Sequence, residues 1–289
     1  MISTHWPHFI QVPNSNAKLP RIWWCPTGPL AFLPIHAAGI YKQGKCIPGQ
    51  TLSEFAVSSY SPTVNVCYSS KSADNSCNSL AGLLMISQPN TPGQARIPFA
   101  RDEVEKIKNQ IGMQGIPSST LDGGNATISR VLESMEEFPC IHLACHASQH
   151  METPLKSSIH LHDGPLKLSE IIKKNLHNAN FAFLSACQTS KGDTNLPEEV
   201  VHLASGMLAA GYQSVVGTMW SVSDKHSPDL AEFFYKKLLV DSDVMNEGPR
   251  IDGCRAAQAL HDATKCLQEK VSGSSNSFLA WVPYIHLGI

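Results

Sequence analysis

Short, uninterrupted apolar segments constrain the fold of this chain more than any other feature. Leu83–Ser87, Cys140–His146 and Phe181–Cys187 are almost entirely apolar, and each is shorter than an ordinary helix. Strands that are apolar on both faces are typical of a parallel sheet covered by helices on both sides. Segments with helical features lie between these strands, so the pattern predicts an α/β protein with a mostly parallel central sheet.

Further strands and helices complete this pattern. Strands are expected at 21–25, 53–60, 215–220 and 279–285. Helices are expected at 101–111, 128–137, 171–176, 198–210, 229–240 and 254–270. Thr127 is the candidate N-cap of the helix at 128–137. Residues 1–20, which contain three prolines, are expected to form a loop-like extension ahead of one domain over 21–289.

The composition excludes several classes of protein. Only 16% of the 289 residues are charged and 42% are hydrophobic, which argues against a disordered chain. The net charge of −2 lacks the basic excess of a nucleic-acid-binding protein. We therefore expect a folded domain without a nucleic-acid partner.

One uncharged segment raises the question of a membrane span. Val200–Ser223 contains 24 residues without Asp, Glu, Lys or Arg, which is long enough to cross a bilayer. Three glycines interrupt it, and Ser214–Thr218 reads as a separate β-branched run. We expect a buried helix followed by a buried strand rather than a membrane segment.

The nine cysteines indicate a reducing compartment. Their number is odd, they are scattered, and no C-x-x-C pair occurs. The N-terminus has neither the basic nor the apolar region of a signal peptide. We expect reduced thiols in a cytoplasmic protein, most of them serving as small core residues.

Two predicted strands end in residues with reactive side chains. One strand leads to His146 and the other to Cys187. Ligands of open parallel sheets bind at the carboxyl ends of the strands, so the two side chains are candidates for one site. A neighbouring imidazole activates a thiol by accepting its proton. The competing interpretation is that Cys187 is an ordinary buried thiol and His146 an ordinary core histidine.

The residues around these positions carry a family resemblance. HLACHA at 142–147 and LSACQT at 184–189 resemble the CHAT domain, a caspase-like cysteine peptidase domain related to separase. Further matching blocks follow in the family's order over roughly 20–289. They are TGPLAFLPIHAAG (27–39), ARDEV (100–104), EVVHLA (199–204), AAGY (209–212), GTMWSVSD (217–224) and WVPYIHLG (281–288).

The resemblance implies a fold, an activity and a set of site residues. The implied fold is a caspase-like three-layer sandwich with helices on both faces of the sheet. The implied activity is cysteine-type endopeptidase cleavage of protein or peptide substrates by a His146–Cys187 dyad, in a regulated signalling or stress and defence setting. The implied oxyanion hole uses the backbone N–H groups of Cys187 and Ala147, where many caspase-like enzymes have glycine in place of Ala147. CHAT domains commonly follow helical repeats, which implies an upstream TPR-like region or a regulatory partner.

Two residues just past the end of the strand segment Val215–Met219 are candidates for a substrate pocket. Trp220 and Asp224 follow the end of this strand, next to the expected dyad. An acidic Asp224 would favour a basic residue before the cleaved bond. The alternative places Trp220 in the core and makes Asp224 a cap of the following helix.

Other motifs lack the partners that their chemistry needs. His142 and His150 flank His146 at four-residue spacing, but this segment is predicted to be a strand rather than a helix. His160, His162 and Asp163 have no second ligand pair at zinc-site spacing. Gly39–Cys46 has phosphate-loop spacing but ends in Cys and is soon followed by Pro48. We expect neither a metal nor a cofactor.

Fold alone does not determine function, so a second hypothesis stays open. The chain is either a cysteine endopeptidase or a catalytically silent domain that keeps the fold for interaction or scaffolding. Retention of both dyad residues favours the enzyme.

Overall fold

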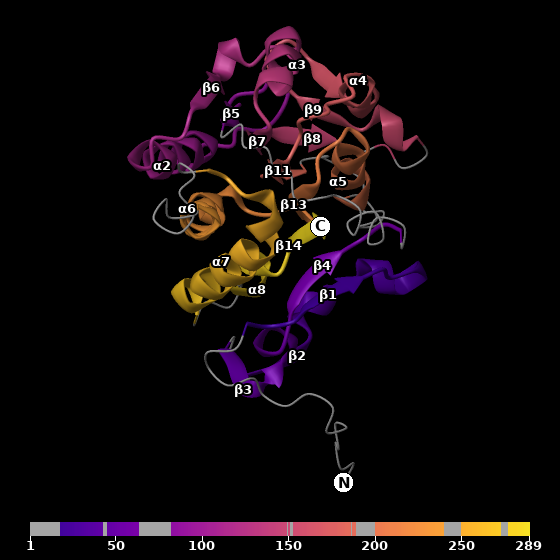
Figure 1. Cartoon of the computed structure of the whole chain (residues 1–289), viewed down its shortest axis with the longest axis vertical. Helices are drawn as coiled ribbons and strands as arrows, with labels where there is room; N and C mark the ends of the chain where they lie inside the picture. Colours follow the sequence, from indigo (N-terminus) through magenta and orange to yellow (C-terminus); the bar gives the residue numbers. More distant parts are fainter. Residues whose placement is uncertain are drawn as a thin grey trace.

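A computed structural model shows a three-layer α/β fold (Figure 1). The structure describes residues 18–42, 45–63, 82–148, 150, 153–185, 187–188, 200–239, 250–272 and 277–289. For residues 187–188 and 200–202, only the backbone is described. The predicted loop at 1–20 therefore lies almost entirely outside the described residues, as does a predicted loop at 69–79.

An eight-stranded sheet forms the middle layer. Its order is β1 (Arg21–Trp24), β4 (Val57–Tyr60), β14 (Tyr284–Gly288), β13 (Ser214–Thr218), β11 (Phe181–Leu184), β7 (Cys140–Ala144), β5 (Leu83–Ser87) and β6 (Ser118–Asp122). All neighbouring strands pair in parallel except β13 and β14. The central strands are buried on both faces, which explains their continuous apolar sequences.

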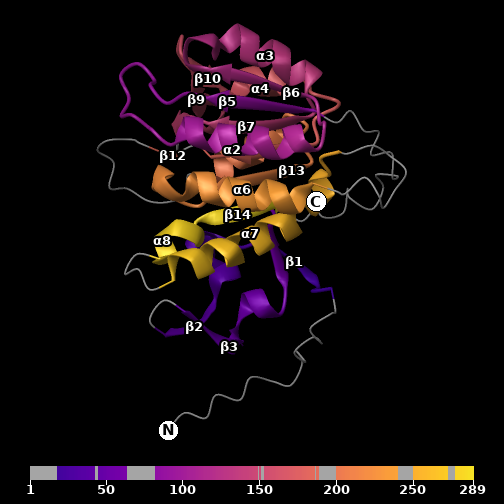
Figure 2. The same ribbon diagram turned by 90° about the vertical axis from the view of Figure 1, so that its left-hand side faces the viewer.

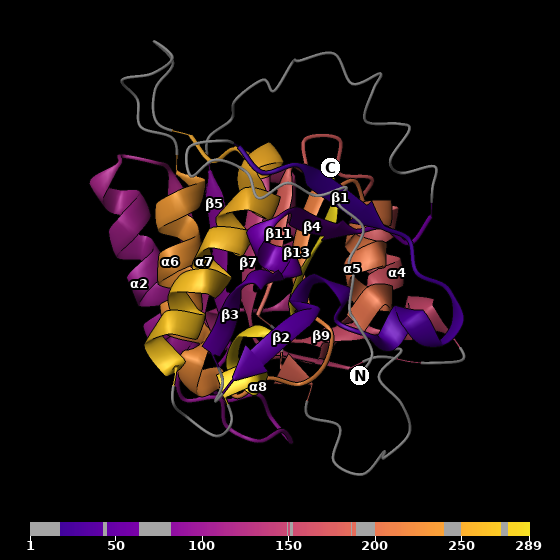
Figure 3. The ribbon, with the colours of Figure 1, turned by 90° about the horizontal axis from the view of Figure 1, so that it is seen from below.

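Helices cover both faces of this sheet, as Figure 3 shows in an end-on view. One face carries α2 (Ala100–Met113), α6 (Ser227–Leu238), α7 (Ala256–Val271) and the short α8 (Ser277–Trp281). The opposite face carries α3 (Ile128–Glu137), α4 (Leu168–Lys173) and α5 (Val200–Ala209). In Figure 2, α2, α6 and α7 lie one above another across the sheet. The predicted fold class is confirmed.

Two smaller sheets flank the main one. The first has the order β10 (Pro165–Lys167), β9 (Ser158–His160), β8 (His146–Ser148) and β12 (Cys187–Gln188). The second is a hairpin of β2 (Gly39–Lys42) and β3 (Lys45–Thr51). The hairpin contains the segment with phosphate-loop spacing, which therefore does not lead from a loop into a helix.

Two predicted strands are each divided in the structure. The segment expected as one strand at 140–146 ends at Ala144, bends at Cys145 and continues as β8 in the small sheet. The segment expected at 181–187 likewise ends at Leu184 and resumes as β12. The apolar composition predicts burial but not the bend, because the chain stays buried through β8.

The prediction of a strand at 279–285 is wrong in its position. Residues 277–281 form α8, and the strand β14 begins only at Tyr284. In α8 the Trp281 side chain packs against Phe278 and Tyr41, which is a helical contact pattern. A short apolar run fits either a buried helix or a buried strand, and Pro283 separates the two here.

The N-cap prediction for α3 is also corrected. Thr127 occupies the N-cap position, but its side chain makes no capping hydrogen bond. Instead the backbone N–H of Ile128 donates to the Asp163 carboxylate at 2.9 Å. The first turn of α3 is thus capped from the turn between β9 and β10.

The uncharged segment at 200–223 forms α5 and then β13, as predicted. Within the described parts of the chain, no helix has the length and apolar character needed to cross a membrane.

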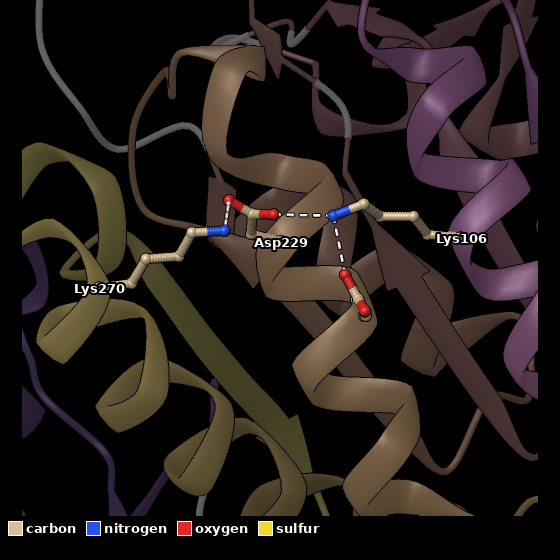
Figure 4. A network of polar contacts seen from close by, with 4 residues as sticks. Lys106, Asp229 and Lys270 are labelled. Atoms are coloured by element: carbon tan, nitrogen blue, oxygen red, sulfur yellow. Dashed lines mark hydrogen bonds and ion pairs between the residues drawn. The ribbon is translucent and has the colours of Figure 1, made fainter.

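Charged side chains join three of the helices on one face of the sheet. Lys106 on α2 contacts Asp229 and Glu232 of α6 at 2.8 and 2.7 Å, and Lys270 on α7 contacts Asp229 at 2.6 Å (Figure 4). These groups are partly exposed, so the network supplements the apolar packing between the helices rather than replacing it.

Candidate active site

The two predicted dyad residues lie side by side on adjacent strands. Cys187 of β12 pairs with His146 of β8 in a parallel ladder, and Gln188 pairs with Ala147. Both short strands begin where β11 and β7 leave the carboxyl edge of the main sheet. Paired positions on neighbouring strands project to the same face, about 5 Å apart. The backbone therefore places Cys187 and His146 in the same cross-strand row.

The imidazole of His146 is buried and oriented by a backbone carbonyl. Its Nε2 lies 2.6 Å from the carbonyl oxygen of Ala95, and the residue is only 1% exposed. A carbonyl oxygen can only accept, so Nε2 carries the proton that is donated. A ring that carries its proton on Nε2 has its lone pair on Nδ1.

The loop that supplies this carbonyl is held at several points. It joins β5 to α2, and Ile97 within it is buried and donates its N–H to the Pro89 carbonyl oxygen at 3.1 Å. Arg96 donates to the Asn90 side-chain oxygen at 2.8 Å. These bonds fix the backbone on both sides of Ala95, which fixes the direction of the bond to His146.

Ala147 carries a methyl group at the position directly after His146, so its backbone conformation decides whether alanine fits there without strain. A glycine would be needed there only for a left-handed backbone. Among the described non-glycine residues, Asn175 alone has a positive φ, so Ala147 has an ordinary extended conformation in β8. The replacement of glycine by alanine therefore brings no backbone strain, and the N–H group is retained.

Trp220 and Asp224 lie beyond the carboxyl end of β13, the strand next to β11. Trp220 is half-buried and packs against the cores on both faces of the sheet. Asp224 accepts a hydrogen bond from the backbone N–H of Phe99, at the start of α2, at 3.4 Å. Asp224 thus contacts the β5–α2 loop, the same loop that holds His146.

A third residue joins the row that contains the dyad. His160 of β9 pairs with His146 of β8 in an antiparallel ladder, on the side away from Cys187. Its Nε2 is buried and has no hydrogen-bond partner among the described residues. Burial lowers the pKa of His160, and the charge of the neighbouring His146 lowers it further.

The other candidate histidines have structural contacts. His142 is fully buried, with Nε2 at 3.0 Å from the Glu103 carboxylate and Nδ1 at 3.2 Å from the Tyr235 hydroxyl. His150 accepts a hydrogen bond from the backbone N–H of Thr153 at 3.1 Å. His162 is exposed. No group of three potential metal ligands occurs among the side chains that the structure describes.

Comparison with known proteins identifies the family. The model of the CHAT domain matches residues 4–289, nearly the whole chain. The chain belongs to the CHAT family. A comparison with curated protein sequences gave no match for this CHAT domain.

Solved structures give the same fold. Two crystal structures of the Saccharomyces cerevisiae separase–securin complex match the CHAT domain with TM-scores of 0.52 and 0.51. Each has 14% identity and covers 82% of this chain and 14% of the other. The Arg-specific cysteine proteinase gingipain R has a TM-score of 0.46 and 12% identity, covering 72% of this chain and 46% of the other. This CHAT domain spans less than half of each of these chains.

Sequence reasoning missed two parts of the site. A backbone carbonyl such as that of Ala95 leaves no signature in the sequence, because any residue type supplies it. His160 was considered only as a metal ligand. Its alternation with the core residues Ile159 and Leu161 would have placed it on the face opposite the core.

Proposed function

We propose that this CHAT domain is a cysteine endopeptidase that uses His146 and Cys187. The observation that supports this most is the register that pairs Cys187 with His146 at the carboxyl edge of the sheet. The bond from His146 to the Ala95 carbonyl oxygen adds an orientation suited to a general base. The CHAT membership and the fold shared with separase are consistent with this chemistry.

In the proposed reaction, Nδ1 of His146 takes the proton of the Cys187 thiol. The thiolate attacks the carbonyl carbon of a peptide bond and forms a tetrahedral adduct, whose negative oxygen is held by the N–H groups of Cys187 and Ala147. Collapse of the adduct breaks the C–N bond, and His146 donates its proton to the leaving amine. Water then hydrolyses the thioester, with His146 again acting as base.

In this scheme the Ala95 carbonyl group orients the ring of His146. Its carbonyl oxygen accepts from Nε2 in every step, so the ring keeps one orientation while Nδ1 gains and loses a proton. The imidazolium form strengthens that hydrogen bond because its donor is charged. Trp220 and Asp224 are proposed to line the pocket for the residue before the cleaved bond, with the Asp224 carboxylate favouring a basic side chain.

Selective labelling of Cys187 tests the proposal. The full chain is incubated near neutral pH with a peptide-based thiol electrophile, and labelling rates are measured by mass spectrometry at Cys187 and at the exposed Cys25 and Cys254. We expect Cys187 to react at least about tenfold faster, because a paired imidazole raises its thiolate fraction. Cys187→Ala is the control for site assignment. Equal rates at the three cysteines would contradict the proposal.

Cleavage of a peptide library then separates the enzyme from a silent interaction domain. The proposal expects cleavage products with the wild-type chain and none with Cys187→Ala, and a preference for basic residues before the cleaved bond that weakens in Asp224→Asn. Selective labelling without any cleavage, in the presence of the upstream region or partner, would favour the silent domain.

A further inference from the structure

The small sheet presents three residues with reactive or titratable side chains in one cross-strand row. Cys187 of β12, His146 of β8 and His160 of β9 occupy paired positions on three adjacent strands. The row ends at Pro165 of β10, which pairs with His160 and has no titratable group. His146 is thus the residue between the thiol and the second imidazole.

The contacts on this sheet show which face the row occupies. Ala147 and Ile159, which alternate with the two histidines, pack in the core beneath the sheet. His146 and His160 therefore lie on the opposite face, where the Ala95 loop covers His146. Two residues along on that face, the hydroxyls of Ser148 and Ser158 are 3.0 Å apart, so paired side chains make contact there.

The two imidazoles differ in their hydrogen-bond partners. The Nε2 of His146 has the Ala95 carbonyl oxygen as its hydrogen-bond acceptor. His160 is half-buried, and its Nε2 is enclosed without a partner among the described residues. A charge on His160 would be poorly solvated at Nε2 and would lie next to any charge on His146.

We propose that His160 is the charge partner of His146: the two imidazoles share a single positive charge, and the neutrality of His160 keeps that charge on His146 beside Cys187. His160 acts through His146 and is therefore a positioning residue. Its functional meaning rests on the role proposed above for His146. The lowered pKa of His160, caused first by burial and then by the charge of His146, agrees with this assignment.

Other titratable groups near His160 are less suited to this part. His162 is exposed, and the Asp163 carboxylate accepts from the N–H of Ile128. Lys167 of β10 is exposed and pairs with Ser158 at the far end of the hairpin. Cys187 lies one strand further away, beyond His146. Among the titratable groups that the structure describes, His146 is the one paired directly with His160.

The test measures the titration of both rings in the full chain by nuclear magnetic resonance of the imidazole Cε1–H groups. The resonances are assigned from His146→Gln and His160→Gln. Coupling between two sites is reciprocal, so a positive charge on either ring must lower the pKa of the other. In His146→Gln we expect the pKa of His160 to rise, while burial still holds it below its ordinary value.

A fixed charge tests the same coupling from the other side. His160→Lys should lower the pKa of His146 by about one unit or more, because a like charge then stands permanently beside it. The neutral variant His160→Gln should leave the pKa of His146 close to that of the wild type. His162→Lys adds the same charge at an exposed position in the turn that follows β9, and we expect a much smaller effect there.

Two results would overturn the assignment. One is a His160 titration that is unchanged by His146→Gln, and the other is an equal shift of His146 in His160→Lys and His162→Lys. Thermal unfolding of each variant identifies one that fails to fold, in which case the pair of glutamine variants decides. Non-selective labelling of Cys187 together with coupled titrations would reject the peptidase function while leaving the shared charge in place.

Discussion

His142 and His146 lie four residues apart in one buried segment, yet the structure uses them differently. His142 is inside β7, where both ring nitrogens contact buried side chains from α2 and α6. The ring also stacks on Phe183, with 4.8 Å between centroids. His146 comes after the bend at Cys145, where its ring meets a backbone carbonyl and the row that contains Cys187.

The difference shows how position along a strand decides the role of a residue. Within the sheet a polar side chain must satisfy its hydrogen bonds from the helices that cover it. Beyond the carboxyl edge the covering layer over His146 is a loop, and a backbone carbonyl of that loop contacts the ring. Burial alone does not separate the two histidines, because they are 0% and 1% exposed.

Exchanging each ring for an amide should give opposite results. His146→Gln is expected to lower the labelling rate of Cys187 by about 10²- to 10⁴-fold, the usual contribution of a general base, and to change stability by less than about 1 kcal/mol. His142→Gln is expected to keep the labelling rate within about threefold and to lose about 1–3 kcal/mol, because the amide cannot reproduce both contacts of the buried ring, with Glu103 and with Tyr235. Labelling kinetics and urea unfolding measure the two effects. Parallel losses in both variants would remove the distinction.

Replacing His142 and Glu103 by leucine tests the structural role of His142 more directly. His142→Leu alone leaves the Glu103 carboxyl group without its partner and should lose about 3–5 kcal/mol. Adding Glu103→Leu removes that buried polar group, so the double variant should recover most of the loss. Urea unfolding of the two single variants and the double variant forms a complete cycle. A double variant as unstable as the sum of the single ones would show that the two residues act independently.

The sequence predicts both the central strands and the proposed dyad, because each strand is a continuous apolar run that ends where polar residues begin. Continuous apolar runs mark β5, β7 and β11, and the first polar residues after β7 and β11 mark the carboxyl edge where the site lies. The Ala95 carbonyl could not be predicted, since its position depends on the path of a loop between β5 and α2. His160 alternates with the buried Ile159 and Leu161, but this pattern gives only its face and not its pairing with His146 on the neighbouring strand.

The strand β14 and the separate β2–β3 hairpin were harder to predict for a related reason. β14 begins after a helix and Pro283, and the apolar residues on both sides of the proline form one run in the sequence. Hairpins such as β2–β3 contain few buried residues, so the apolar pattern gives little signal there. The family resemblance located these regions in order but not their secondary structure.

Acid should destabilise the fold by protonating three histidines other than His142 and His146. Burial lowers the pKa of His36 and of His261 to about 4, and holds that of His286 well below its ordinary value. The unfolded chain takes up these protons near pH 6.5 while the folded chain does not, so stability falls as the pH drops from about 7 towards 4. Each such histidine contributes at most about 1.4 kcal/mol per pH unit within this window.

Urea unfolding between pH 7 and pH 5 measures this slope before most carboxyl groups titrate. His36 contacts the Tyr60 hydroxyl at 2.8 Å and the Val282 carbonyl oxygen at 2.9 Å. His36→Gln removes one titrating ring and should make the slope shallower. The exposed His162→Gln should leave it unchanged. Stability that stays constant, or rises, towards pH 5 would contradict the assignment of these rings as neutral structural groups.

The smallest effect is expected where α2 and α6 are joined at the surface. Lys106 contacts Asp229 and Glu232, but its side chain is 37% exposed, whereas Glu103 and His142 join α2 to β7 in the core. Lys106→Met should therefore cost less than about 1 kcal/mol. Lys108→Met is the control, because Lys108 is exposed on the same helix and forms no ion pair with a described residue. In 1 M salt the two variants should converge, since charges this close to solvent are screened. A loss in Lys106→Met that persists in 1 M salt and approaches that of His142→Leu would mean that the surface network, rather than the buried histidine, holds α2 and the β5–α2 loop in place.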